Sequence, residues 1–279
     1  MKTRAARTAP ATASEAVKRL VAGNEAFGRM AEAGARGEHA VIQLDPGDLG
    51  FGAAPGVAPA QRPFAAVLGC ADARVPVEMV FQQRSNDLFV VRVAGNGIGL
   101  GGLGSFRYAA ANFADSLKLI VVLGHSQCGA VTAAVDAFLL PRTYLPMAGD
   151  YPLRSLVDGI LVAVRAAGIA LERGHGLQVA KRPGYRAALI ETSVIMNAAF
   201  AAYSLERELG SRRCRVVFGR YDLASGRLHL PLGSPTVAGN GTALVAPPRD
   251  SEAFSRLGEA VAASERVRTL LRGGGAGKH

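Results

Sequence analysis

Residues 117–128 read LKLIVVLGHSQC, a nearly continuous apolar run that ends in polar, chemically active side chains. A run such as Leu117 to Leu123 is typical of a strand buried on both faces of a parallel sheet. Two similar runs precede it, Phe64 to Leu68 and Leu88 to Val93, and each is followed by a turn and a helical pattern. Strands that alternate with helices in this way predict an α/β fold whose parallel sheet is covered by helices on both faces.

Helical patterns account for most of the remaining chain, apart from a Gly- and Pro-rich loop at residues 45–63. We expect Ser14 to cap a first helix, because apolar residues then recur on one helical face. Two late strands are expected at 215–218 and 228–230. The other expected helices span residues 76–81, 102–113, 128–140, 153–173, 185–209 and 251–272.

Composition narrows the class of protein. Of 279 residues, 49% are hydrophobic, which is enough for a large core and excludes wholesale disorder. Lys and Arg number 32 against 22 Asp and Glu, a formal charge of +10, but the basic residues are scattered rather than clustered. Trp is absent and aromatic residues make up only 6%, so platforms for stacking bases are scarce and we expect no nucleic-acid partner.

The cysteine count and the apolar segments bear on compartment. Three cysteines are too few for a disulfide scaffold and fit a reducing compartment, so we expect a cytoplasmic protein. The first twenty residues lack the apolar core of a secretory signal. Residues 187–205 are long enough to cross a membrane, but they contain Glu191 and Asn197. A carboxylate is expensive inside a bilayer, so we expect a buried helix and no membrane span.

Two turns that directly follow predicted strands carry metal-binding side chains. Cys70 follows the first strand, and His125 and Cys128 follow the third. Ligands of open parallel sheets gather at the carboxyl ends of the strands, so these three side chains are expected to meet. Sulfur and imidazole donors favour Zn²⁺, and three protein donors leave the fourth position of a catalytic zinc for water or substrate. The third cysteine, Cys214, lies in a different strand pattern and is expected to be a core thiol.

Asp72 and Arg74 lie on the same turn as Cys70 and can bond to each other. In one interpretation Arg74 keeps Asp72 ionised and oriented, so that Asp72 accepts a hydrogen bond from a metal-bound water. In the other, Asp72 occupies the fourth zinc position and closes the site. The nearby Gly97–Gly102 segment matches G-x-G-x-x-G, but no acidic residue ends the next strand, which argues against a dinucleotide site. We expect its glycines to let the backbone approach the metal cleft instead.

Five segments resemble the β-class carbonic anhydrases, in that family's order. GCADARVPVE carries the Cys-x-Asp-x-Arg pattern and LIVVLGHSQCGAV carries His-x-x-Cys. LFVVRVAGN resembles the strand and turn between them, RLVAGNEAF the N-terminal helix and GRYDLASGRL the closing hairpin. The resemblance covers roughly residues 15–232. It therefore divides the chain into a flexible basic arm (1–13), a catalytic domain (14–232) and a C-terminal extension of unassigned role (233–279).

The resemblance implies reversible hydration of carbon dioxide to bicarbonate and a proton by zinc-bound hydroxide. It implies a mostly parallel sheet with a late antiparallel strand and an obligate homodimer, or a higher even oligomer, with the cleft at the subunit interface. The residues it implicates are the zinc ligands Cys70, His125 and Cys128, the dyad Asp72 and Arg74, and the substrate contact Gln61. Val67 replaces the Trp of the family's allosteric subgroup, which argues against closure of the site by a second bicarbonate.

Two other functions stay open at this point. Related folds with the same metal ligands hydrolyse carbonyl sulfide or carbon disulfide, so the chain could be a zinc hydrolase of such a sulfur analogue. Alternatively, it could be a non-catalytic zinc-binding scaffold whose site is closed by Asp72.

Overall fold

The computed structural model describes residues 8–39, 41–42, 46–49, 56–210, 214–229 and 243–273. Within them, a five-stranded sheet has the order β2-β1-β3-β4-β5. The strands are β1 (Ala65–Gly69), β2 (Leu88–Arg92), β3 (Leu119–His125), β4 (Arg215–Asp222) and β5 (Arg227–Leu228). The first four strands are parallel and β5 pairs with β4 antiparallel, which confirms the expected fold class.

The strand register brings the metal-binding turns to one edge of the sheet. Gly69, the last residue of β1, pairs with Leu123 in β3 and with Arg92 in β2. Cys70 and His125 therefore emerge side by side from neighbouring strands. All seven residues of β3 are buried, as expected of an apolar strand covered on both faces.

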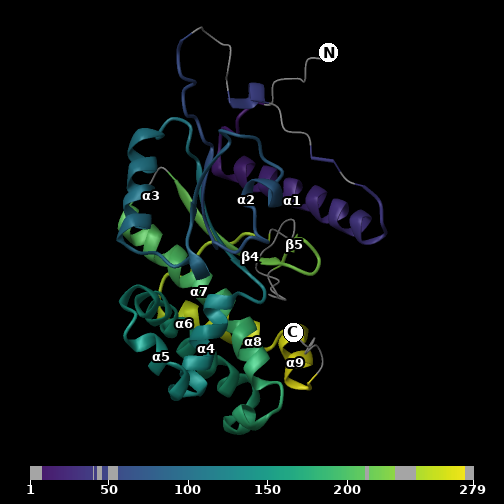
Figure 1. The fold of residues 1–279 in the computed structure, drawn as a ribbon, viewed down its shortest axis with the longest axis vertical. Coiled ribbons are helices and arrows are strands. Elements are labelled where there is room, and N and C mark those ends of the chain that lie inside the picture. Colours follow the sequence, from purple (N-terminus) through teal and green to yellow (C-terminus); the bar gives the residue numbers. More distant parts are fainter. Residues whose placement is uncertain are drawn as a thin grey trace.

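Helices cover both faces of the sheet (Figure 1). One core cluster joins the sheet to α1 (Ala13–Ala35) and α2 (Val77–Val80). The opposite cluster joins it to α3, α4 and the helices that follow. These are α3 (Leu100–Asn112), α4 (Gly129–Leu139), α5 (Leu145–Ala148), α6 (Tyr151–His175), α7 (Tyr185–Leu209), α8 (Ser251–Ala262) and α9 (Glu265–Leu271). Short 3-10 turns occupy Pro46–Leu49, Ala94–Asn96, Pro141–Thr143 and Leu177–Lys181.

The first helix begins earlier than predicted. Its N-cap is Thr12, whose hydroxyl accepts a hydrogen bond from the Glu15 amide at 3.2 Å, so the expectation of a cap at Ser14 is wrong. The Glu15 carboxylate in turn accepts a hydrogen bond from the Ala11 amide at 2.8 Å. Thr-x-x-Glu resembles a capping box, except that Glu15 binds the amide of the residue before the N-cap, and two bonds thus stabilise a start at Thr12.

The single helix expected at 251–272 is instead two helices. Ser264 interrupts it and caps α9 by accepting a hydrogen bond from the Val267 amide at 3.3 Å. The break lets α8 pack on α6 while α9 turns onto α7. A Cβ added at Gly258 would lie 2.8 Å from Ala170, so the α8–α6 contact is close. The predicted domain boundaries stay predictions, but both helices of the extension pack against the helices beside the sheet.

The apolar helix α7 is a core helix, as expected. Of its most apolar 18-residue window, 78% is buried inside the protein. The sheet, α6, α8 and α9 all contact it. Much of its cover comes from α8 and α9 of the same chain.

Replacing Gly184 with alanine is expected to loosen α9. Gly184 precedes α7, and a Cβ there would lie 1.8 Å from the Leu270 carbonyl oxygen, a backbone atom that cannot move without displacing α9. We expect the variant to lose about 1–3 kcal/mol of unfolding free energy in urea denaturation.

Gly159→Ala is the matched control, because Gly159 lies within α6 and nothing approaches its Cβ position within 4 Å. That control should gain roughly 0.5–1 kcal/mol from helix propensity. Equal stability of the two variants would contradict the tight docking of α9.

Candidate metal centre

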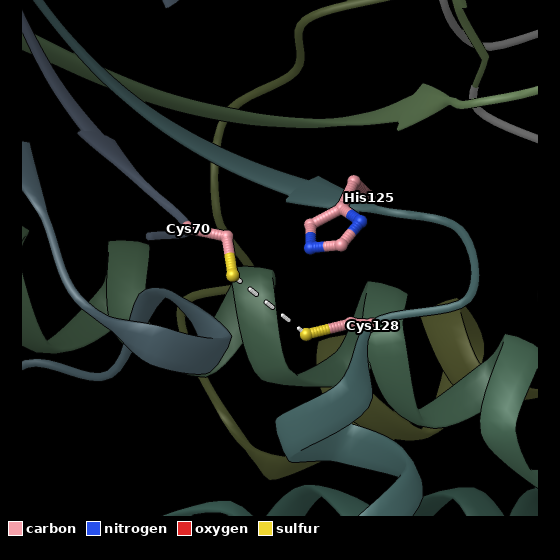
Figure 2. A group of neighbouring side chains, drawn as sticks. All are labelled: Cys70, His125 and Cys128. Atoms are coloured by element: carbon pink, nitrogen blue, oxygen red, sulfur yellow. Dashed lines mark hydrogen bonds between the residues drawn. The ribbon is translucent and has the colours of Figure 1, made fainter. Parts of the chain in front are cut away.

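Three buried side chains converge where β1 and β3 end. Cys70 follows β1 directly, His125 is the last residue of β3, and Cys128 caps the start of α4. Their donor atoms all lie within 4.8 Å of one another, and the two Sγ atoms are 3.9 Å apart. Figure 2 shows the two sulfurs and the imidazole ring pointing toward one another. The structure thus brings together the three donors that the sequence singled out.

The surroundings of His125 leave one ring nitrogen free for a metal. Its Nδ1 lies 2.9 Å from the Ser126 carbonyl oxygen, which can only accept, so Nδ1 carries the proton. Nε2 then presents a lone pair, and it is buried without a hydrogen-bond partner among the described residues. A metal-binding histidine characteristically donates its other ring N–H to a carbonyl or carboxylate in this manner.

Backbone amides stabilise negative charge on Cys70. Its Sγ accepts hydrogen bonds from the Gly95 amide at 3.2 Å and the Asp72 amide at 3.4 Å. The pKa of the Cys70 thiol is lowered to about 4, chiefly by the Cys128 thiol beside it and further by His125. The same neighbour, together with burial, raises the pKa of Cys128. A divalent metal would favour the deprotonated form of both thiols.

This donor set fits zinc. Two thiolates and one imidazole bind Zn²⁺ in preference to Mg²⁺ or Ca²⁺, which favour oxygen ligands. Three protein donors leave one coordination position of the zinc open. Cys214 does not join the group, because its buried thiol donates to the Leu117 carbonyl at 3.4 Å beside the start of β4. Its placement agrees with the expected core thiol.

Asp72 borders the three donors and is held by Arg74. Both carboxylate oxygens accept from the guanidinium, Oδ1 from Nε at 3.0 Å and Oδ2 from Nη2 at 2.8 Å. Arg74 is the main reason that the pKa of Asp72 is lowered to about 2. Oδ2 lies 3.9 Å from Nε2 of His125, so the ionised carboxylate faces the site while it remains bound to Arg74.

Two residues that the sequence did not single out hold the metal-binding turns in place. Arg92 donates from Nε to the Cys70 carbonyl at 2.9 Å and from Nη2 to the Asp72 carbonyl at 2.5 Å. Asn197 of α7 donates from Nδ2 to the Gly95 carbonyl at 2.7 Å, which fixes the turn whose amide binds Cys70. For Asn197, the sequence did offer a signal of a specific contact, namely an amide side chain in the middle of an otherwise apolar helix.

Gly95 is the glycine that allows this close approach. Its φ is +66°, and a Cβ would lie 2.8 Å from Cδ1 of Ile160 and 3.0 Å from Cβ of Ala130. The glycines at 97–102, by contrast, lie just before α3 or in its first turn, and a Cβ at any of them would come no closer than 3.2 Å to another residue, Ile98 beside Gly102. The expectation that the 97–102 segment lets the backbone approach the cleft is therefore wrong, because the turn just before it does so.

Gln61 is not brought to the three donors within one chain. It is exposed, and its neighbours Ala60 and Arg62 both hydrogen-bond to Asn86, at 2.9 Å each. That anchor lies at the amino ends of β1 and β2, whereas the donors follow the carboxyl ends. The five residues of β1 separate the two levels by roughly 16 Å at about 3.3 Å per residue. A contact between Gln61 and a substrate stays a prediction.

Comparison with known proteins identifies similar sequences. A sequence model of the carbonic anhydrase family matches residues 65–228, which include all three donors, Asp72 and Arg74. Carbonic anhydrase 2 of Mycobacterium tuberculosis is 47% identical over 93 residues, covering 32% of this chain and 44% of that protein. The carbonic anhydrase of Mycolicibacterium smegmatis is 51% identical over 78 residues, covering 28% and 37%. The aligned part thus spans less than half the length of each of these relatives.

Solved structures show a more distant similarity. A Coccomyxa β-carbonic anhydrase in complex with acetazolamide superposes with a TM-score of 0.49 at 22% identity, covering 74% of this chain and 82% of that one. The family assignment depends on the sequence match rather than on this superposition.

Proposed function

Because the chain belongs to the β-class carbonic anhydrase family, we propose that it catalyses the reversible hydration of carbon dioxide to bicarbonate and a proton, with zinc as its cofactor. The observation that carries the proposal is the buried Cys70–His125–Cys128 group, in which the Nε2 lone pair of His125 faces two sulfurs. Composition and fold alone would fit many activities, whereas this donor set beside an ionised carboxylate fits few.

Cys70, His125 and Cys128 would hold the zinc ion. Zinc supplies a Lewis acid that lowers the pKa of a water molecule, so that hydroxide is available near neutral pH. Two thiolates reduce the positive charge that the metal presents. We therefore propose a higher pKa for that water than in zinc sites with three neutral histidines.

The protein's own groups position the nucleophile and the metal ligands. Asp72 is ionised at any working pH, so its Oδ2 can accept a hydrogen bond from a water or hydroxide beside His125. Arg74 fixes the direction of that carboxylate through two bonds. The Ser126 carbonyl fixes the His125 tautomer, and the Gly95 amide donates a hydrogen bond to Sγ of Cys70.

The structure bears differently on the two alternatives. A scaffold closed by Asp72 is disfavoured, because both carboxylate oxygens bind Arg74 and closure would break that pair. No contact among the described residues favours a sulfur-containing substrate over carbon dioxide. We also propose that the protein acts in the cytoplasm, where the thiols of its three cysteines would stay reduced.

We propose a homodimer or higher even oligomer as the active form. Gln61 lies at the opposite strand ends from the donors, so it could contact substrate only in the site of another copy. β2 is an edge strand whose residues are mostly half-buried, so a second copy could pack beside it. Analytical ultracentrifugation of the zinc-loaded protein should give an even number of subunits, and a monomer that is fully active would contradict the proposal.

Stopped-flow assays of the zinc-loaded protein test the reaction itself. We expect carbon dioxide hydration that rises with pH between pH 6 and 9, disappears on chelation and returns when zinc is added. Carbonyl sulfide and carbon disulfide serve as parallel substrates. Turnover of a sulfur substrate without carbon dioxide hydration, or bound zinc without any turnover, would contradict the proposed function.

A further inference from the structure

A buried charged cluster joins the C-terminal extension to the sheet. Its members are Glu191 of α7, Arg220 and Asp222 of β4, and Arg266 of α9. Arg220 donates hydrogen bonds from Nη2 to Oε2 of Glu191 at 3.1 Å and to Oδ1 of Asp222 at 3.0 Å. Arg266 approaches from the extension, with Nε 3.0 Å from Oε1 of Glu191 and Nη2 3.9 Å from Oδ1 of Asp222.

Arg266 balances the charge of this cluster. Glu191, Arg220 and Asp222 are nearly inaccessible, at 5%, 1% and 7% exposure. Two carboxylates against Arg220 alone would leave a net negative charge away from water, which is unfavourable unless it is neutralised. The guanidinium of Arg266 supplies the second positive charge and can contact both acids. The Arg266 side chain is itself 45% exposed, but both of its acidic partners are buried, so the pair is less screened than one between two exposed side chains.

The cluster lies next to the turn that carries the metal donors. His125 pairs in register with Tyr221, the residue between Arg220 and Asp222. The Ser126 amide donates to the Tyr221 carbonyl at 2.9 Å, and the Leu223 amide donates to Oγ of Ser126 at 2.9 Å. Ser126 is therefore hydrogen-bonded to both neighbours of Asp222 in the chain, Tyr221 and Leu223. Ser126 in turn binds Nδ1 of His125 through its carbonyl oxygen.

We propose that Arg266 is a positioning residue for the metal centre. Through its ion pairs with Glu191 at 3.0 Å and Asp222 at 3.9 Å, Arg266 holds the end of β4 in place, and β4 holds the Ser126 turn that aims Nε2 of His125 at the two sulfurs. Arg266 lies outside the matched family segment, which ends at residue 228, so the device belongs to the extension of this chain. The inference depends on the metal site of the proposed function, but not on which substrate that site converts.

The test compares three variants for zinc affinity by competition with a chromophoric chelator. Arg266→Gln removes the positive charge and the guanidinium donors, and Arg266→Lys restores the charge alone. Arg268→Gln is the matched control. Arg268 lies on the same helix and forms an ion pair with Glu265 at 3.4 Å in which both side chains are exposed. Removal of a positive charge should by itself strengthen cation binding, so a weaker affinity reports on the position of the ligands.

We expect Arg266→Gln to weaken zinc binding by about tenfold, within the range usual for groups that orient metal ligands. The visible bands of its cobalt-substituted form should shift, because the His125 ligand is less firmly oriented. Arg266→Lys should recover most of the affinity, and Arg268→Gln should match the wild type. In steady-state assays, kcat should fall with zinc saturating while KM is unchanged.

Two outcomes would overturn the inference. One is a normal zinc affinity and cobalt spectrum in Arg266→Gln, even if its melting temperature falls, because Arg266 would then be only structural. The other is an equal loss in Arg268→Gln, which would indicate a general effect of charge on α9. Failure of the proposed function is distinguishable, since wild-type protein that binds zinc without hydrating carbon dioxide would leave the affinity comparison intact.

Discussion

Replacing Cys128 with alanine is expected to remove metal and activity together. Cys128 is 1% exposed and lies 3.9 Å from Cys70, so its thiolate would be one of three donors to the same ion. Two remaining donors would bind zinc far more weakly than three. We expect less than roughly a tenth of the wild-type zinc content after dialysis, and carbon dioxide hydration at the background rate. Atomic absorption and stopped-flow assays on the same samples measure both quantities.

Cys214→Ala is the matched control. Cys214 is also buried, but its thiol donates to the Leu117 carbonyl and takes no part in the donor group. Its replacement should leave zinc content and turnover unchanged, at a loss of about 1 kcal/mol in stability. Retention of a full zinc equivalent by Cys128→Ala would show that the metal is held elsewhere.

Replacing Asp72 with asparagine is expected to spare the metal and lower the rate. The carboxylate is outside the donor group, but its Oδ2 lies 3.9 Å from His125 and faces the place where the nucleophile would lie. Asparagine removes the charge and can accept from Arg74 through only one atom. We expect kcat/KM for carbon dioxide to fall by about 100-fold, as is usual when a group that handles the proton of the nucleophile is lost. Zinc content should stay near one per chain.

Asp136→Asn supplies the comparison for that variant. Asp136 also binds an arginine through two bonds, from Arg186 at 2.6 and 2.8 Å, but this pair joins α4 to α7. Its loss should change turnover by less than about twofold, as expected for an exposed ion pair. If Asp72→Asn instead raised activity at neutral pH, the closed-site interpretation would replace the open one.

The protonation of Asp72 should not limit activity in the working range. Its pKa is lowered from 3.8 to about 2 by Arg74, so the folded state favours the charged form. The stabilisation from this pair is therefore complete above pH 3.8 and is lost only as the pH falls toward 2. Carbon-13 NMR of the Asp72 carboxyl group should show no titration step above about pH 4. A midpoint near neutrality would contradict the assigned pairing.

The sheet and the three donors were predictable because their signals are local. A buried strand needs a continuous apolar run, and the residue after it reaches the ligand-binding edge whatever the rest of the chain does. Cys70 and His125 each follow such a run after a single glycine, Gly69 and Gly124. The Asp72–Arg74 pair is equally local, since two residues on one turn can meet without help from distant segments.

The misses depend on contacts between distant parts of the chain. Asn197 lies 102 positions from Gly95, and no short pattern shows that one binds the other. Likewise, the apolar pattern of 251–272 could not show that Ser264 ends one helix and starts another, because docking on α6 and α7 decides the break. Gln61 illustrates the same difficulty. It lies only nine residues before Cys70 in the sequence, but β1 runs between them and places them at opposite ends of the strands.

X-ray absorption at the zinc edge tests the central claim most directly, because it counts the atoms around the metal. The structure predicts one zinc per chain with two sulfur neighbours at about 2.3 Å, one imidazole nitrogen at about 2.0–2.1 Å and one further light atom. The same protein with Cys214→Ala should give an unchanged spectrum. A spectrum fitted by nitrogen and oxygen alone, or by a single sulfur, would contradict a site built from Cys70, His125 and Cys128.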